Sequence, residues 1–135
     1  MYYELAIKHI IIDRKGNDKE VTDKYIVENC ELFAEAEQKG LELPLTASDV
    51  TTIKRSAIKE FVNTPTNDAA EAIYIATIVD TFVNDDGDEK KLKYKVALYA
   101  LSVTNANKIT QEYMAQGLCD MECEEIKKTS FIEVI

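Results

Sequence analysis

The sequence predicts an α+β protein built as a tandem duplication of a β-β-α-β unit, with mainly antiparallel strands and helices packed on one sheet face. A shift of 71 residues places Tyr3 on Tyr74. A shift of 73 places Ile53 on Ile126, and the order of predicted elements also matches. Apolar residues make up 46% and charged residues 30% of the 135 residues, the composition of a folded globular chain.

The first copy begins with a strand, because Tyr3, Leu5 and Ile7 alternate with more polar residues. Gly16 lies in the following turn, where a positive φ is needed, and residues 21–27 form the return strand. These two segments predict a β-hairpin.

A short helix and a third strand complete the first copy. The helix is predicted over residues 32–39, with Gly40 as its C-terminal stop. The strand is predicted over residues 50–62. Its Lys54 and Arg55 recur in the second copy as lysines, which at a sheet edge discourage aggregation.

The second copy repeats this order. Strand, turn, return strand, helix and closing strand are predicted at residues 73–82, 84–89, 92–100, 106–114 and 123–135. Ser102 or Thr104 is the predicted N-cap of this helix, and Gly117 its stop.

The two copies are predicted to span residues 1–63 and 69–135, separated by a polar seam around Pro65. Three strands and one helix enclose only a thin core. We therefore expect one compact domain in which the copies share a core, either as one six-stranded sheet or as two packed sheets.

Three short segments resemble a family of proteins. Residues 100–107 look like the strand-to-helix junction of a domain-of-unknown-function family of short proteins from Bacteroidetes and their phages. Residues 23–27 and 53–56 are similar to other recurrent segments of that family. The chain departs from the pattern at residues 30–33, where the junction carries an extra residue. The resemblance implies a gut-bacterial or phage origin, and it lends no activity to any residue.

The charge of the chain bears on its partners and location. Its formal net charge is −9, which argues against binding nucleic acids or anionic membranes, because both require clusters of Lys and Arg. No basic signal-peptide region or long apolar run is present. We expect a bacterial cytoplasmic location, with incorporation in a phage virion as the alternative.

Metal and cofactor sites are not expected. Cys30, Cys119 and Cys123 with the single histidine, His9, leave a Cys3His zinc site as a formal alternative to structural thiols. The spacing of Cys119 and Cys123 fits zinc only loosely. The sequence therefore favours reduced, structural cysteines.

An acidic turn offers another candidate site. Asp85, Asp86 and Asp88 could hold Ca²⁺ or contact a partner, but they lack the EF-hand spacing. The matching turn around Gly16 has Arg14 and Lys15 at its centre and cannot hold a cation there. A hairpin turn is the plainer interpretation.

No catalytic constellation is recognisable, so the sequence predicts a protein that is not an enzyme. His9 aligns with Asp80, and the two could pair as base and orienting group if their strands lie together. A lone strand histidine is more often structural. Nucleophile elbows and phosphate-binding glycine loops are missing from the sequence.

Tyrosines are the remaining candidates for partner contacts. The chain has seven of them and no tryptophan. Tyr25, Tyr94 and Tyr99 lie on predicted strands, where tyrosine serves packing or, on a bare sheet face, anchors an interface. Both interpretations stay open.

These observations favour a non-enzymatic protein-interaction or assembly protein, encoded by a bacterium or a phage, that acts through an exposed sheet face or edge. Its expected partner is another protein or a second copy of itself. One alternative is an acidic inhibitor that competes for the nucleic-acid-binding groove of a host protein. Another is a small ligand-binding domain or enzyme with a site where the repeats meet.

Overall fold

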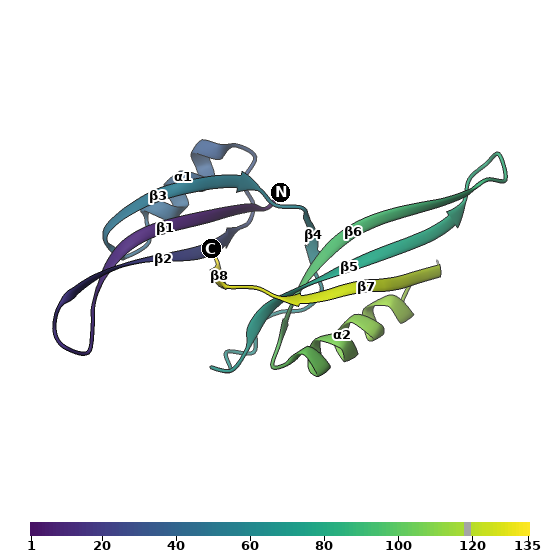
Figure 1. The fold of residues 1–135 in the computed structure, drawn as a ribbon. Helices are drawn as coiled ribbons and strands as arrows, with labels where there is room; N and C mark the ends of the chain where they lie inside the picture. The colour runs from purple at the N-terminus through teal and green to yellow at the C-terminus, as the bar shows by residue number, and fades with distance from the viewer. Residues whose placement is uncertain (118–119) are drawn as a thin grey trace. The chain divides into compact units, whose positions relative to one another are not determined.

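The computed structural model describes residues 1–117 and 120–135 and confirms the α+β class (Figure 1). Within these residues the elements are β1 (Tyr3–Ile12), β2 (Asp18–Val27), α1 (Phe33–Leu41), β3 (Thr46–Arg55), β4 (Ile58–Phe61), β5 (Ala72–Val83), β6 (Glu89–Ala100), α2 (Val103–Ala115), β7 (Asp120–Lys128) and β8 (Phe131–Val134). The chain divides into two compact units: unit 1 comprises Met1–Ser56 and Ser130–Ile135, and unit 2 comprises Ala57–Thr129.

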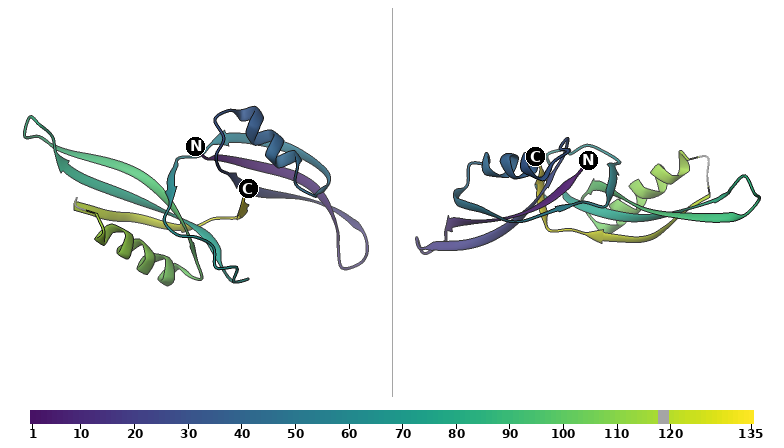
Figure 2. Two further views of the ribbon diagram at one scale, coloured as in Figure 1. Left: turned by 180° about the vertical axis from the view of Figure 1, so that it is seen from behind. Right: turned by 90° about the horizontal axis from the view of Figure 1, so that it is seen from above.

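In the described part of the chain, each unit contains one four-stranded sheet and one helix. The strand order is β3-β1-β2-β8 in unit 1 and β7-β5-β6-β4 in unit 2. In each sheet only the pairing of the fourth strand, β8 with β2 or β4 with β6, is parallel. Figure 2 shows one helix on one face of each sheet. The mainly antiparallel arrangement is thus confirmed, whereas a single six-stranded sheet is wrong.

The strand registers agree with the predicted duplication. Lys24 on β2 pairs with Phe131 on β8, and Lys95 on β6 pairs with Ile58 on β4. The shift of 71 residues carries Lys24 to Lys95, and the shift of 73 carries Ile58 to Phe131. The two shifts therefore relate the Lys24–Phe131 pair of unit 1 to the Lys95–Ile58 pair of unit 2.

The single strand predicted at the end of each copy is wrong. It divides into β3 and β4 in the first copy and into β7 and β8 in the second. The backbone N–H of Ser56 donates to Tyr2 O at 2.9 Å, and that of Thr129 donates to Ile73 O at 3.0 Å. The neighbouring strands, β1 and β5, begin at Tyr3 and Ala72, so they offer few further backbone groups for pairing. The chain therefore leaves one sheet, and its next strand joins the sheet of the other unit.

Each unit has its own cluster of buried apolar side chains under its helix. Unit 1 buries Tyr3, Leu5 and Ile7 with at most 1% exposure. The equivalent residues of unit 2, Tyr74, Ala76 and Ile78, belong to its cluster. The alternation predicted for the first strand is therefore confirmed in β1, whereas β5 buries residues of both faces, Ile73 and Thr77 as well as Tyr74, Ala76 and Ile78. A core shared by the two copies stays a prediction.

The two helices differ at their ends. Ser102 is the N-cap of α2, as predicted, and its side chain accepts from Asn105 N at 3.1 Å. Helix α1 begins after Leu32, which provides no side-chain cap. Residues 28–32 separate β2 from α1, whereas only residues 101–102 separate β6 from α2, and Asn29 in the longer junction adopts a φ of 59°.

The predicted stop at Gly40 is wrong, because α1 continues to Leu41. Gly40 is buried in the last turn, and a Cβ there would lie 2.7 Å from Leu5 Cδ1 and 3.3 Å from Ile7 Cδ1. The glycine therefore allows close approach of helix and sheet. Gly117 follows the C-cap of α2, as predicted.

Candidate functional site

The three tyrosines proposed as partner contacts pack within their own units. Tyr25 is 5% exposed in the core cluster of unit 1, and burial, followed by the charges of Asp23 and Glu133, raises the pKa of its phenol. Tyr94 is half-buried in unit 2, where its hydroxyl donates to Met121 Sδ at 3.7 Å.

Tyr99 is also half-buried in unit 2. Its ring stacks on Phe61 with a centroid distance of 5.4 Å, and its backbone N–H donates to Asn63 Oδ1 at 2.8 Å. Lys59 Nζ lies 4.4 Å from the centroid of Tyr94, a cation–π contact. In both cases a tyrosine on β6 contacts a residue of β4, so these rings help to attach the parallel strand to its sheet.

The acidic residues lie together and exposed in the turn between β5 and β6. Asn84 Oδ1 accepts from the backbone N–H groups of Asp86 at 3.1 Å and Asp88 at 2.9 Å. Gly87 provides the positive φ of 82°. The carboxylates of Asp85, Asp86 and Asp88 are therefore outside the bonds that shape the turn.

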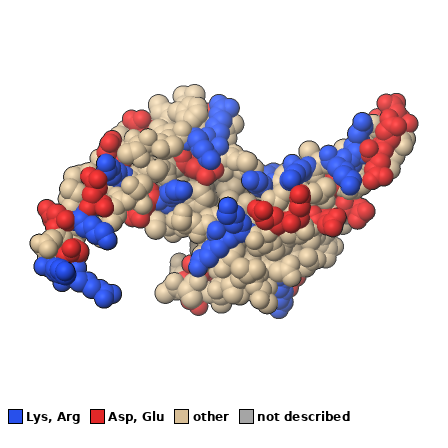
Figure 3. Space-filling view, in the orientation of Figure 1, with Lys and Arg blue, Asp and Glu red and all other residues tan. Residues whose placement is uncertain are grey.

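The turn between β1 and β2 has the same geometry and a different charge. Asp13 Oδ1 accepts from Lys15 N and Asn17 N, both at 2.9 Å, and Gly16 has a φ of 81°. Here the carboxylate is the capping group, and the exposed residues at the centre are Arg14 and Lys15. Figure 3 shows blue side chains at the end of the β1–β2 hairpin and red ones at the end of the β5–β6 hairpin.

Both hairpins extend beyond the third strand of their sheet (Figure 1). Strand β3 pairs with β1 from Tyr3 to Ile10, and β7 pairs with β5 from Tyr74 to Thr81. We call residues 11–21 arm 1 and residues 82–92 arm 2. Each arm consists of the ends of two strands and the turn that joins them.

The arms carry large apolar side chains in contact with solvent. In arm 1, Ile11 is 41% and Ile12 73% exposed. In arm 2, Phe82, Val83 and Leu92 are 41%, 68% and 52% exposed. The shift of 71 residues carries Ile11 to Phe82 and Ile12 to Val83, so the exposure recurs at equivalent positions. Apolar side chains grouped on a protruding element are typical of interaction sites. The sequence analysis missed this feature, although Ile11 and Ile12 directly precede the first turn.

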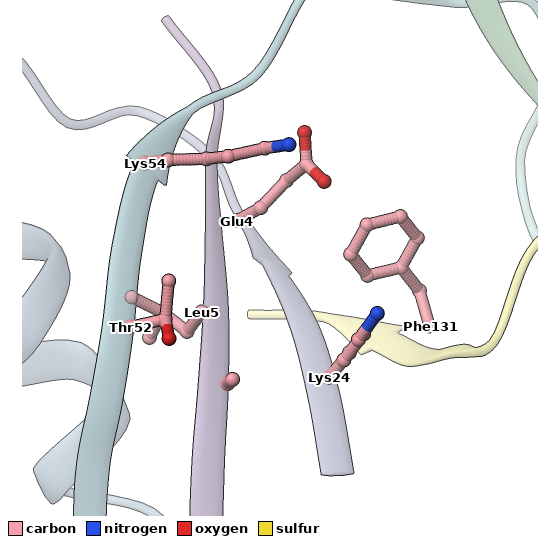
Figure 4. Close-up of a pocket in the computed structure, with 7 residues that line it drawn as sticks. Glu4, Leu5, Lys24, Thr52, Lys54 and Phe131 are labelled. Atoms are coloured by element: carbon pink, nitrogen blue, oxygen red, sulfur yellow. The ribbon is translucent and has the colours of Figure 1, made fainter.

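A pocket of about 210 Å³ lies in unit 1, on the face of the sheet opposite α1 (Figure 4). Its lining residues are Glu4, Leu5, Ala6, Lys24, Thr52, Lys54 and Phe131. Lys54 points toward Glu4, and Lys24 points toward the Phe131 ring. The Glu4 carboxylate offsets the Lys54 ammonium, so the Lys24 ammonium, the Phe131 ring and the Thr52 hydroxyl remain to contact a small carboxylate. The volume is below the roughly 300 Å³ at which drug-sized ligand sites begin.

His9 pairs with Asp23 rather than with Asp80. In unit 1, His9 Nε2 lies 2.8 Å from Asp23 Oδ2, and His9 is 5% exposed. Asp80 belongs to unit 2, where its Oδ1 is buried and has no hydrogen-bond partner among the described residues. So little exposure leaves the imidazole almost no access to a substrate, and the contact with Asp23 serves the packing of unit 1.

Among residues 1–117 and 120–135, no group of three or more His, Cys, Asp or Glu side chains is placed to hold a metal ion. Cys30 is buried in unit 1. Cys123 is half-buried in unit 2, and burial raises the pKa of its thiol. Cys119, the third cysteine of the zinc alternative, lies outside the described residues.

Comparisons with known proteins place the whole chain in one family. The model of a domain of unknown function (DUF4494) matches residues 1–135. No curated protein matches the sequence, and no solved structure does. Within the described part of the chain, no helix has the length and apolar character needed to cross a membrane.

Proposed function

The chain belongs to the DUF4494 family of domains of unknown function, and we propose that it is a non-enzymatic protein-interaction or assembly protein. Its partner surface is formed by the protruding parts of its sheets, arm 1 and arm 2. The observation that carries this proposal is the repetition of an arm with apolar side chains in contact with solvent.

Energetics favour these positions as contacts. Burying a Val, Ile or Phe side chain in an interface removes it from water and contributes about 1.5–3 kcal/mol. In an arm, Ile12 and Val83 contribute little of this to folding, because they stay 73% and 68% exposed. Each arm therefore retains its apolar area for a partner.

A partner-retention experiment tests the proposal. The double variant Ile12→Thr, Val83→Thr keeps β-branched side chains and removes apolar surface from both arms. Leu101→Thr is the matched control, since Leu101 is 51% exposed outside the arms. We expect the wild type and the control to retain the same partner, either a protein of the native host or a second copy, and the double variant to lose it. Retention by all three, or by none, would refute the proposal.

A small-ligand site in unit 1 is the second candidate function, favoured by the pocket between Lys24, Lys54 and Phe131. Binding of a small aromatic carboxylate, followed by NMR shifts of the Thr52 and Ala6 amides, tests it. Loss of these shifts in Lys54→Met would support the site, and their absence in the wild type would exclude this ligand class.

The acidic-inhibitor hypothesis depends on the turn of arm 2, where Asp85, Asp86 and Asp88 are exposed. Glu89 adds to this negative charge, and Lys90 and Lys91 after it offset part of the charge. A partner that binds nucleic acids, with affinity falling steeply as salt rises, would support this alternative over the leading one.

An origin in Bacteroidetes or their phages, with a cytoplasmic or virion location, is part of the proposal because of the resemblance noted above. The neighbouring genes and mass spectrometry of purified virions test it.

A further inference from the structure

The two arms have the same backbone and unlike charges at their tips. In arm 1 the Asp13 carboxylate accepts the backbone bonds of the turn, Arg14 and Lys15 are exposed at its centre, and the exposed Asp18 follows, so two cations and two carboxylates share the tip. In arm 2 the neutral Asn84 caps the turn, so Asp85 and Asp86 remain as exposed charges. One scaffold therefore carries two cations at the centre of the arm 1 turn, which we call the basic tip, and four carboxylates without a cation in residues 84–89 of arm 2, which we call the acidic tip.

We propose that arm 1 of one copy of this chain binds arm 2 of a second copy. The inference rests on the proposed function and names its partner. Arg14 and Lys15 of one chain face the carboxylates around Gly87 of the other, and the apolar side chains behind the two tips contact each other.

In this contact the apolar residues provide most of the binding free energy, and the charged residues determine which arm binds which. Exposed ion pairs contribute little free energy, whereas Ile12 on one side and Val83 with Leu92 on the other leave water together. Pairing two acidic tips brings eight carboxylates together and is disfavoured, whereas a basic tip places Arg14 and Lys15 against the carboxylates of arm 2. Unlike arms are therefore the preferred pair.

The ends of the strands offer backbone groups as well. Arm 1 extends β1 past its pairing with β3 at Ile10, and arm 2 extends β5 past its pairing with β7 at Thr81. Short stretches of strand edge at these positions can pair with another strand. The lengths of the two arms correspond, which suits an arm-to-arm contact.

A contact between unlike surfaces has two possible outcomes. Two chains can use both arm pairs and close a dimer, or each chain can use one pair and continue into a head-to-tail series. Both outcomes require an acidic and a basic tip on different copies.

Charge-swapped variants test the inference. The basic tip is reversed in Arg14→Glu, Lys15→Glu, and the acidic tip in Asp85→Lys, Asp86→Lys. Each variant then carries two like-charged arms. We expect wild-type self-association in sedimentation velocity, at least about ten-fold weaker association of either variant, and recovery when the variants are mixed. Higher salt should weaken the wild-type complex.

The control is Lys108→Glu, a charge reversal on the exposed surface of α2 that should leave association unchanged. Unchanged melting temperatures show that all variants are folded. A wild type that remains monomeric at high concentration overturns the inference, and so do variants that associate like the wild type. A monomeric wild type that retains a host protein through its arms refutes the inference but leaves the proposed function in place. If it retains nothing, both fail.

Discussion

At Gly40 the absence of a side chain allows α1 to lie close to the sheet of unit 1. A Cβ at this position would lie 2.7 Å from Leu5 Cδ1, and Leu5 is 1% exposed in the core. We expect Gly40→Ala to lower the free energy of unfolding by about 1–2 kcal/mol, because overpacking outweighs the gain in helix propensity. Urea unfolding followed by circular dichroism measures the change.

The matched control is Gly117→Ala. There the added methyl group would meet the Cε of Met121 at 2.8 Å, the far end of a flexible, half-buried side chain. This variant should change stability by less than about 1 kcal/mol. Equal losses from both variants would show that Gly40 has no special packing role.

Asp23 is the partner of a buried histidine, and its removal leaves a ring nitrogen unpaired. His9 Nε2 lies 2.8 Å from Asp23 Oδ2, and His9 is 5% exposed. We expect Asp23→Ala to destabilise the protein by about 1–3 kcal/mol, the penalty for an unsatisfied buried polar group. Asp23→Asn retains an acceptor and should lose less. If Asn and Ala were equally tolerated in thermal unfolding, the pair would be incidental.

At the level of elements, the two helices differ in their N-caps. Ser102 caps α2 through a bond to Asn105 N at 3.1 Å, while Leu32 occupies the same position of α1 without a side-chain bond. Ser102→Ala should therefore cost about 1 kcal/mol, and Leu32→Ser should gain about 0.5–1 kcal/mol. Both changes are read from melting temperatures, and shifts of the same sign for both would contradict the prediction.

Strands and turns were predictable from the sequence because their signals are local. The alternation from Tyr3 to Ile7 and the glycine of each turn identify the hairpins without knowledge of the rest of the chain. The stop assigned to Gly40 failed, because glycine signals a helix end and close packing equally. The two possibilities are distinguished only by the tertiary structure, which places Gly40 against Leu5 and Ile7 of the sheet.

The candidate site was less predictable than the elements. Asp85, Asp86 and Asp88 were found because a cluster of carboxylates is visible in the sequence, and they lie at an exposed tip. The apolar residues of the arms were missed, since exposure depends on where β3 and β7 stop pairing. That information is in the tertiary structure alone.

On the scale of the whole molecule, the repeats of the sequence and the units of the structure are divided at different points. The similarity runs along the chain, but β4 joins the sheet of unit 2 and β8 that of unit 1. The pattern of apolar residues across Ser56 and Ala57 continues without a signal for this change. A strand stops pairing where its neighbouring strand ends, and the position of that end cannot be predicted from the sequence of the pairing strand.

The C-terminal segment is therefore predicted to stabilise the unit that begins the chain. Ile135 N donates to Ile26 O at 2.8 Å, Glu28 N donates to Ile135 O at 3.1 Å, and the Ile135 side chain packs on the unit 1 core. Removal of residues 130–135 should lower hydrogen-exchange protection about ten-fold or more in β2 and β1, because their sheet loses its outer strand. Amides of β5 and β6 in unit 2 should stay protected.

Two further variants separate the loss of the strand from a general effect on folding. Ile135→Asp keeps β8 but places a charge against the unit 1 core, so it should weaken protection in β1 and β2 to a smaller degree. Ile132→Thr changes a residue of the same strand that is 56% exposed and should have no effect. If exchange accelerated equally in both units, the C-terminal strand would belong to one cooperative core rather than to unit 1, because only a local contribution leaves β5 and β6 unchanged.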